Sequence, residues 1–170
     1  NKHKMKKIYF LLTCLIASNI YAQNHTETFE QLTGLEGKWT GTINYTNKAP
    51  ETLDLKYTVT AMGTALVEES NEGGVGMMTV FNLQNQKLLL THYCAAQNRP
   101  VAEITENKNG ELLFKTNHSK SDLNLAEDFF VTSFKFDLLL NDKNTFKYEY
   151  TAEGADGESY SANAVLKRVM

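Results

Sequence analysis

Short segments in which apolar and polar residues alternate restrict the fold of this chain more than any other feature. In the clearest segment, Glu51–Ala61, every second residue is apolar. A period of two is typical of a β-strand that has one buried and one solvent-facing side. The sequence therefore predicts a strand here, with these residues on its buried side: Leu53, Leu55, Tyr57, Val59 and Ala61.

Comparable segments follow at short spacing and predict further strands. Connections of hairpin length, rich in Asn and Gly, separate most of them. The pattern favours an all-β fold, an antiparallel up-and-down β-barrel of about 8–10 strands, because such a barrel closes on itself and leaves no edge. A sandwich is the alternative, and it needs longer connections. Besides a strand from Gly37, the further expected strands are Thr64–Ser70, Gly76–Asn82, Gln86–Cys94, Val101–Glu106, Glu111–Thr116, Asp128–Leu140, Asn144–Glu153 and Ser159–Val169.

Two segments are expected to be helical. Thr28–Thr33 predicts a short N-terminal helix or turn, and the longest gap, His118–Glu127, has room for one helical turn. The only tryptophan of the chain lies between them, in Leu35-x-Gly37-x-Trp39-x-Gly41. A tryptophan at the start of a barrel commonly closes one end, and glycines allow a neighbouring backbone to approach.

The first 22 residues predict a leader with a secretory signal peptide. Basic residues at Met5-Lys6-Lys7 precede a short apolar run, Ile8–Ala17, and Ala22 precedes Gln23 as a cleavage site. The run is too short to span a bilayer, so no transmembrane segment is expected. We expect a secreted or periplasmic protein with a single barrel domain over residues 23–170. Lipidation at Cys14 is the alternative, which Thr13 fits poorly.

The remaining chain has 148 residues, a size that suits one domain with a full core. Cleavage would remove four lysines and no acidic residue, leaving 13 basic and 20 acidic residues and a net charge of −7. Such a charge argues against nucleic acid as a partner. Cys94 would be the only cysteine left, so no internal disulfide can form. The sequence gives no indication of the oligomeric state.

His92 and Cys94 form the densest group of reactive side chains, and on a strand they share one face. Residues two apart on a strand lie about 6–7 Å from each other, which is too far for direct proton transfer. Zinc needs about four ligands, and no spacing supplies them, so no metal or other cofactor is expected. Glu68 and Glu69 point to opposite faces and cannot form an acid–base pair.

Aromatic residues gather on the late strands, where most of them must form the barrel core. A barrel of this size also has room for one small apolar molecule, oriented by a few polar groups. His92, Tyr57 and Tyr148 are the candidates with polar tips. We take ten residues as candidate ligand-binding residues: Trp39, Tyr57, Met78, His92, Cys94, Asn98, Arg99, Phe114, Phe134 and Tyr148.

The tryptophan motif, the succession of strands and the closing Val165-Leu166-Lys167-Arg168 resemble calycin-type barrels, the group that contains lipocalins, fatty-acid-binding proteins and nitrobindin-like proteins. Thr91-His92-Tyr93-Cys94 with Asn98-Arg99-Pro100 is similar to a motif of uncharacterised bacterial secreted relatives. The resemblance covers nearly all of the mature chain and implies a barrel with a small cavity and no particular ligand. Nitrobindin-like proteins hold haem through a histidine near the end of the last strand, and Ser159–Ala164 contains none.

The sequence favours a secreted or periplasmic barrel that binds a small apolar molecule. Two alternatives stay open. One is an interaction module of the cell envelope with a packed core, and the other is an enzyme that depends on Cys94 and His92.

Overall fold

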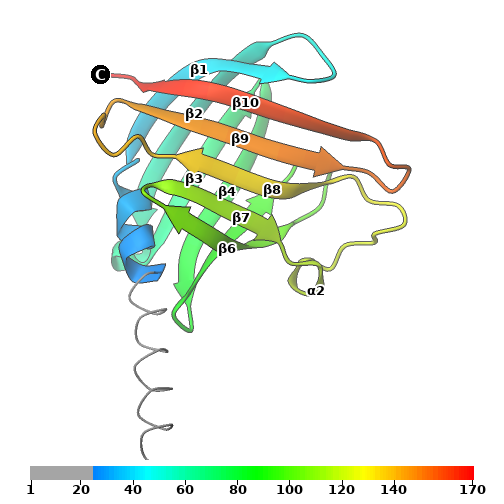
Figure 1. The fold of residues 1–170 in the computed structure, drawn as a ribbon, viewed down its shortest axis with the longest axis horizontal. Helices are drawn as coiled ribbons and strands as arrows, with labels where there is room; N and C mark the ends of the chain where they lie inside the picture. The colour runs from blue at the N-terminus through cyan, green and yellow to red at the C-terminus, as the bar shows by residue number, and fades with distance from the viewer. Residues whose placement is uncertain (1–24) are drawn as a thin grey trace, which may run out of the picture.

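The computed structural model describes residues 25–170, and all ten predicted strands are present within them (Figure 1). The expected signal peptide, its cleavage site and Cys14 lie outside the described residues. The strands are β1 (Gly37–Tyr45), β2 (Glu51–Thr60), β3 (Ala65–Glu72), β4 (Val75–Gln84), β5 (Lys87–Tyr93), β6 (Val101–Lys108), β7 (Glu111–Thr116), β8 (Phe130–Asp137), β9 (Thr145–Glu153) and β10 (Ser159–Arg168).

The strands form one closed antiparallel barrel, as the hairpin-sized connections predict. Each strand pairs with its neighbours in sequence, and β1 closes the barrel by pairing with β10, from Trp39 opposite Arg168 to Tyr45 opposite Ala162. The pairing shifts between Ile104 and Glu106 and between Val131 and Ser133. Such irregularities bend strands and help a sheet to curve. The sandwich is not the fold of this chain.

The up-and-down order gives the barrel two different ends. Every odd-numbered strand begins at one end, which we call the helix end, and finishes at the other, which we call the cavity end (Figure 1). Residues 25–33 form the expected N-terminal helix at the helix end. The predicted helical turn in the long gap is α2 (His118–Ser121), at the cavity end. A single 3-10 turn, η1 (Ala61–Gly63), joins β2 to β3.

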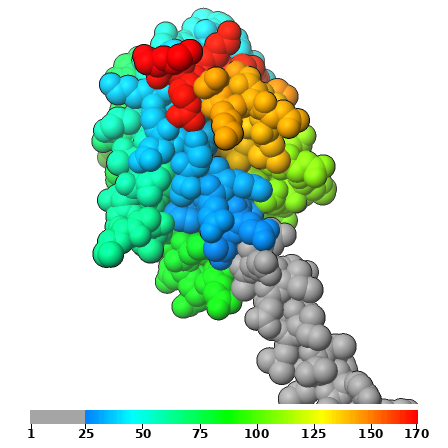
Figure 2. Space-filling model, turned by 90° about the vertical axis from the view of Figure 1, so that its left-hand side faces the viewer, coloured from blue at the N-terminus to red at the C-terminus, as the bar shows by residue number. Residues whose placement is uncertain are grey.

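The N-terminal helix lies across the helix end of the barrel, which Figure 2 views directly. Phe29 and Leu32 are buried in the barrel core. Nδ1 of His25 accepts a hydrogen bond of 3.0 Å from the backbone N–H of Leu88 in β5. The helix therefore closes this end through both apolar packing and a hydrogen bond.

Trp39 completes the closure of the helix end. Its ring meets Phe146 edge-on at 4.8 Å between centroids, and its Nε1–H donates to the carbonyl of Leu35 at 2.7 Å. The guanidinium of Arg168 lies 4.2 Å above the indole ring. Gly41 is needed beside it, because a Cβ atom there would lie 2.5 Å from the carbonyl oxygen of Val165.

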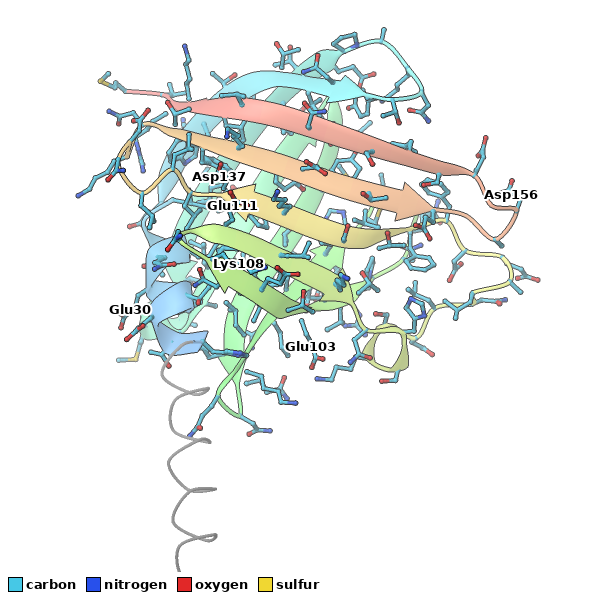
Figure 3. The ribbon with its side chains drawn as sticks, viewed as in Figure 1. Glu30, Glu103, Lys108, Glu111, Asp137 and Asp156 are labelled. Atoms are coloured by element: carbon cyan, nitrogen blue, oxygen red, sulfur yellow. The ribbon has the colours of Figure 1, made fainter. Side chains whose placement is uncertain are left out.

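Charged side chains lie on the outside of the barrel, as the alternating pattern requires. Figure 3 labels Glu111 and Asp137, which are opposite each other on β7 and β8. Each pairs with a lysine on a neighbouring strand, Lys135 at 3.6 Å and Lys147 at 2.9 Å. Within residues 25–170, no helix combines the length and the apolar character needed to cross a membrane.

Candidate ligand-binding cavity

A cavity of about 280 Å³ lies inside the barrel at the cavity end. Strands β2, β3, β4, β5, β8, β9 and β10 contribute to its wall, together with the loops that join them. Phe134 and Tyr148 provide aromatic wall surface, and the ring of His92 lies 5.3 Å from that of Phe134. The wall combines apolar surface with a few polar groups, which is the usual composition of a small-molecule site.

Two carboxylates and two phenols surround the mouth of the cavity. Oε1 of Glu72 accepts hydrogen bonds from the hydroxyls of Tyr45 at 2.7 Å and Tyr150 at 2.8 Å. Burial, followed by the interaction with Glu72, raises the pKa values of both phenols. Nζ of Lys48 lies 2.9 Å from Oε2 of Glu51, and this contact contributes most to lowering the pKa of Glu51. The lysine at the mouth is therefore already paired.

A chain of hydrogen bonds runs from the cavity wall into the barrel core. Nδ1 of His92 lies 3.0 Å from Oγ1 of Thr79, and this hydroxyl lies 3.0 Å from Oε1 of Glu68. The other carboxylate oxygen, Oε2, accepts a short hydrogen bond from the hydroxyl of Tyr57. All four side chains are at least 96% buried. The chain spans four adjacent strands, β2 to β5.

Burial shifts the pKa of each titratable group in this chain toward its neutral form. It raises the pKa of Glu68 to about 7, although the hydrogen bonds from Tyr57 and Thr79 act in the opposite direction. Burial lowers the pKa of His92 to about 4, so its imidazole is neutral at physiological pH. Burial and the charge of Glu68 raise the pKa of Tyr57 well above its usual value.

Four of the ten candidate residues line the cavity: His92, Cys94, Phe134 and Tyr148. Tyr57 lies deeper, as the far end of the hydrogen-bond chain. Asn98 and Arg99 lie in the loop after β5 and border a depression on the outer surface. Nδ2 of Asn98 donates to the carbonyl of Phe129 at 2.8 Å and so connects this loop to the one before β8.

Three further candidates lie away from the cavity. Trp39 is at the opposite end of the barrel, against Phe146. Phe114 packs in the core beside Phe81, at 6.0 Å between centroids. Met78 is exposed on the outside of β4, and its neighbour Met77 lines the cavity instead. The error at Met78 is one of parity, because adjacent residues of a strand point to opposite faces.

Glu68 is the central residue that sequence reasoning passed over. The sequence shows that Glu68 and Glu69 point to opposite faces, and the structure buries the first and exposes the second. Hydrophobicity gave no signal for it, because the inward row of Leu66, Glu68 and Ser70, all buried, is no more apolar than the neighbouring outward row. This inward row ends at Glu72, at the mouth of the cavity.

Cys94 lies at the edge of the cavity, and burial raises the pKa of its thiol. A thiol with a raised pKa is a poor nucleophile at neutral pH, because the thiolate is the reactive form. In the part of the chain that the structure describes, no group of three or more His, Cys, Asp and Glu side chains is arranged to hold a metal ion.

The fold and the cavity define the class: a closed ten-stranded antiparallel barrel with one filled end and one hollow end. No protein-family model matches the chain, and no curated protein matches it. Its structure is similar to that of a protein of unknown function from the DUF3598 family of Nostoc punctiforme, with a TM-score of 0.58 and 13% identity. The match covers 81% of this chain and 48% of the other, so this chain spans about half of that protein's length.

Two other solved structures are similar to a lower degree. A redesigned β-barrel gives a TM-score of 0.40 at 10% identity, with 81% of this chain and 94% of the other covered. EF1p2_mFAP2b bound to DFHBI gives a TM-score of 0.42 at 9% identity, with 84% and 99% covered. Only the similarity to the DUF3598-family protein supports an argument, and at 13% identity it supports the barrel fold alone.

Proposed function

We propose that this protein is an exported, calycin-like barrel that binds one small, largely apolar molecule in the cavity at the cavity end. The observation that carries the proposal is the contrast between the two ends. Side chains fill the helix end, whereas the cavity end keeps about 280 Å³ of space inside an otherwise packed barrel. Packed interiors rarely contain voids of this size, so the space is consistent with a ligand site.

The wall of the cavity supports a compact ligand with an aromatic or aliphatic body. Phe134, Tyr148 and Met77 offer rigid aromatic surface and one adaptable thioether. Ligand pockets commonly have volumes of about 300–1,000 Å³, so this cavity is at the small end of the range. A molecule of one or two fused rings fits this scale better than a long acyl chain.

Two neighbouring methionines provide a matched test of the binding site. Met77→Trp would place a large ring in the cavity, whereas Met78→Trp would place the same ring on the outer surface. We expect N-phenyl-1-naphthylamine, an uncharged fluorophore, to bind wild-type protein and M78W saturably, with one molecule per chain. We expect it not to bind M77W. Absence of saturable binding, or equal binding to the two variants, would reject the cavity as the site.

The natural ligand can be sought by native mass spectrometry of the mature protein purified from its own host. We expect a reproducible adduct that small-molecule extraction releases. Export itself is tested by cell fractionation and N-terminal sequencing, with Gln23 expected as the first residue of the mature chain. A retained leader in the mature protein would contradict export by cleavage, and an acyl group on Cys14 would favour the lipoprotein alternative.

A further inference from the structure

Among the described residues, one ring nitrogen of a residue in the cavity wall has no hydrogen bond to the protein. Nδ1 of His92 is bonded to Thr79, whereas Nε2 has no hydrogen-bond partner among residues 25–170. His92 is 4% exposed and lines the cavity, so Nε2 is the atom that this side chain can offer to a bound molecule. A hydrogen bond between Nε2 and a bound molecule would strengthen binding and favour a ligand with the complementary group.

The neighbours of His92 determine whether Nε2 accepts or donates. A carboxylate only accepts hydrogen bonds, so with Glu68 ionised the single hydroxyl proton of Thr79 is donated to Oε1 of Glu68. Oγ1 of Thr79 then accepts from Nδ1–H of His92. A neutral imidazole carries one proton, and therefore Nε2 presents a lone pair to the cavity. Ionised Glu68 therefore fixes the tautomer of His92 through the hydroxyl of Thr79.

The charges around the cavity disfavour an anionic ligand. The carboxylate of Glu72 lies at the mouth, and Glu68, when it is ionised, adds a negative charge behind the wall. Among the described residues of the wall, Lys48 is the only lysine or arginine, and its charge is offset by that of Glu51. A bound carboxylate would meet these negative charges and the lone pair of Nε2, so the cavity differs from one built for a fatty acid.

On this basis, and resting on the proposed binding function, we propose that the cavity selects a small uncharged aromatic molecule with an N–H or O–H group that it donates to Nε2 of His92. Phe134, 5.3 Å from the imidazole, provides aromatic surface beside this atom. The Glu68–Thr79–His92 chain is thus a specificity-determining device, and Glu68 acts as a positioning residue.

The same chain predicts how the preference can be reversed. In Glu68→Gln the carboxamide oxygen can still accept from the hydroxyl of Tyr57, and its N–H₂ group donates to Oγ1 of Thr79. Thr79 must then donate to Nδ1 of His92, which moves the imidazole proton to Nε2. The variant would therefore offer a donor, where the wild-type protein offers an acceptor.

Three uncharged bicyclic probes test the proposal by isothermal titration calorimetry at about pH 9, where Glu68 is ionised. Indole can only donate, quinoline can only accept, and indene can do neither. For wild-type protein we expect indole to bind about five- to tenfold more tightly than indene, the typical gain from one neutral hydrogen bond. For E68Q we expect quinoline to bind more tightly than indole.

Two variants distinguish the role of His92 from that of its neighbour. The hydroxyl of Tyr148 also lines the cavity and makes no hydrogen bond within the described residues. His92→Phe should abolish the preference for indole over indene, and Tyr148→Phe should preserve it. A preference that survives in H92F and disappears in Y148F would overturn the assignment to His92. Equal binding of indole and indene to wild-type protein would overturn the ligand class and leave the binding function standing, whereas binding of no probe would reject both.

A measurement without ligand tests the tautomer directly. In ¹⁵N-labelled wild-type protein at about pH 9, the ring nitrogens of His92 should show a protonated Nδ1 and an unprotonated Nε2. Tyr57 is bonded to Glu68, Glu72 and Tyr148 interact with Glu68 electrostatically, and Cys94 lines the same cavity as His92. Burial raises the pKa of each of these phenols and of the thiol. A protonated Nε2 in the free protein would contradict the proposal even if every variant failed to fold.

Discussion

The two ends of this barrel are made from the same alternating strands, yet one is filled and the other is hollow. The difference can be followed along a single strand, in the row of side chains that point into the barrel. On β9 the inward row runs from Phe146 at the helix end to Tyr148 and Tyr150 at the cavity end. Polar groups thus enter the interior at the end where the cavity lies, and a strand pattern alone does not make a core solid.

The ends also differ in what holds them together. At the helix end, Trp39 packs against Phe146 under the guanidinium of Arg168. At the cavity end, Glu72 is held by the hydroxyls of Tyr45 and Tyr150. Apolar packing contributes most of the stability of a domain, whereas net contributions from hydrogen bonds are modest. Substitutions at the helix end should therefore cost more stability than those around the cavity.

Trp39→Ala is expected to have the largest effect. Removing this 2% exposed ring leaves a void at the helix end and should lower the free energy of unfolding by about 3–5 kcal/mol. Met77→Ala, at the cavity wall, should cost only about 1 kcal/mol because its side chain already borders open space. Urea unfolding of both variants measures the contrast, and equal losses would refute it.

Glu68→Gln should reveal the cost of a buried charge through its pH dependence. The pKa of Glu68 is about 7 in the folded protein and near 4.5 when unfolded, so between these pH values the folded state binds more protons. The contribution of Glu68 to the stability of the wild-type protein is greatest below about pH 4.5 and is lost as the pH rises through about 7. The stability of E68Q relative to wild type should therefore rise on the order of 3 kcal/mol over this range.

The titration of His92 changes stability with pH in the opposite direction to that of Glu68, and it occurs in both wild-type protein and E68Q. Its pKa of about 4 lies below the unfolded value of 6.5, so its contribution to stability is present above about pH 6.5 and lost as the pH falls through about 4. It cancels in the difference between E68Q and wild type. Chemical unfolding at a series of pH values tests the prediction, and a difference that does not change with pH would contradict the burial of a charge at Glu68.

Gly41→Ala should have a smaller effect, confined to the closure of the barrel. The added methyl group would collide with the carbonyl oxygen of Val165 on β10, and relief of the overlap should cost about 1–3 kcal/mol. Gly76→Ala is the matched control, because a Cβ atom there meets nothing within 4 Å. Thermal unfolding should show G76A close to wild type and G41A clearly below it.

The smallest effect concerns the reactivity of Cys94. Because burial raises the pKa of its thiol, we expect iodoacetamide to modify the folded protein more slowly than the unfolded chain near neutral pH. The rate should rise with pH as the thiolate forms. Mass spectrometry of the modified protein follows the reaction, and rapid labelling of the folded protein would instead favour a reactive thiol.

The sequence predicted the ten strands, the two helical segments and the closed antiparallel order, because alternation and turn residues are local signals. It did not reveal which face of β3 points inward. Leu66 and Val67 are both apolar, and Glu68 and Glu69 are both acidic, so hydrophobicity favours neither face. The structure resolves this by burying Glu68.

The candidate site was predictable only in part, for the same reason. His92 was identified because it lies in the densest group of reactive side chains, on the same strand face as Cys94. Met77 and Met78 are identical residues on opposite faces, and only the pairing of β4 with its neighbours decides between them. That the cavity lies far from Trp39 depends on contacts between distant segments, which no local pattern contains.

The pairing of β1 with β10 has a consequence for how the molecule is made. The seam of the barrel joins the first strand of the chain to the last, so the ring of hydrogen bonds stays incomplete until the final ten residues of the sheet are in place. Until then β1 and β9 are open edges, each able to pair with another chain. Closure of the barrel therefore depends on the last strand, and pairing of β10 with β1 removes both open edges at once.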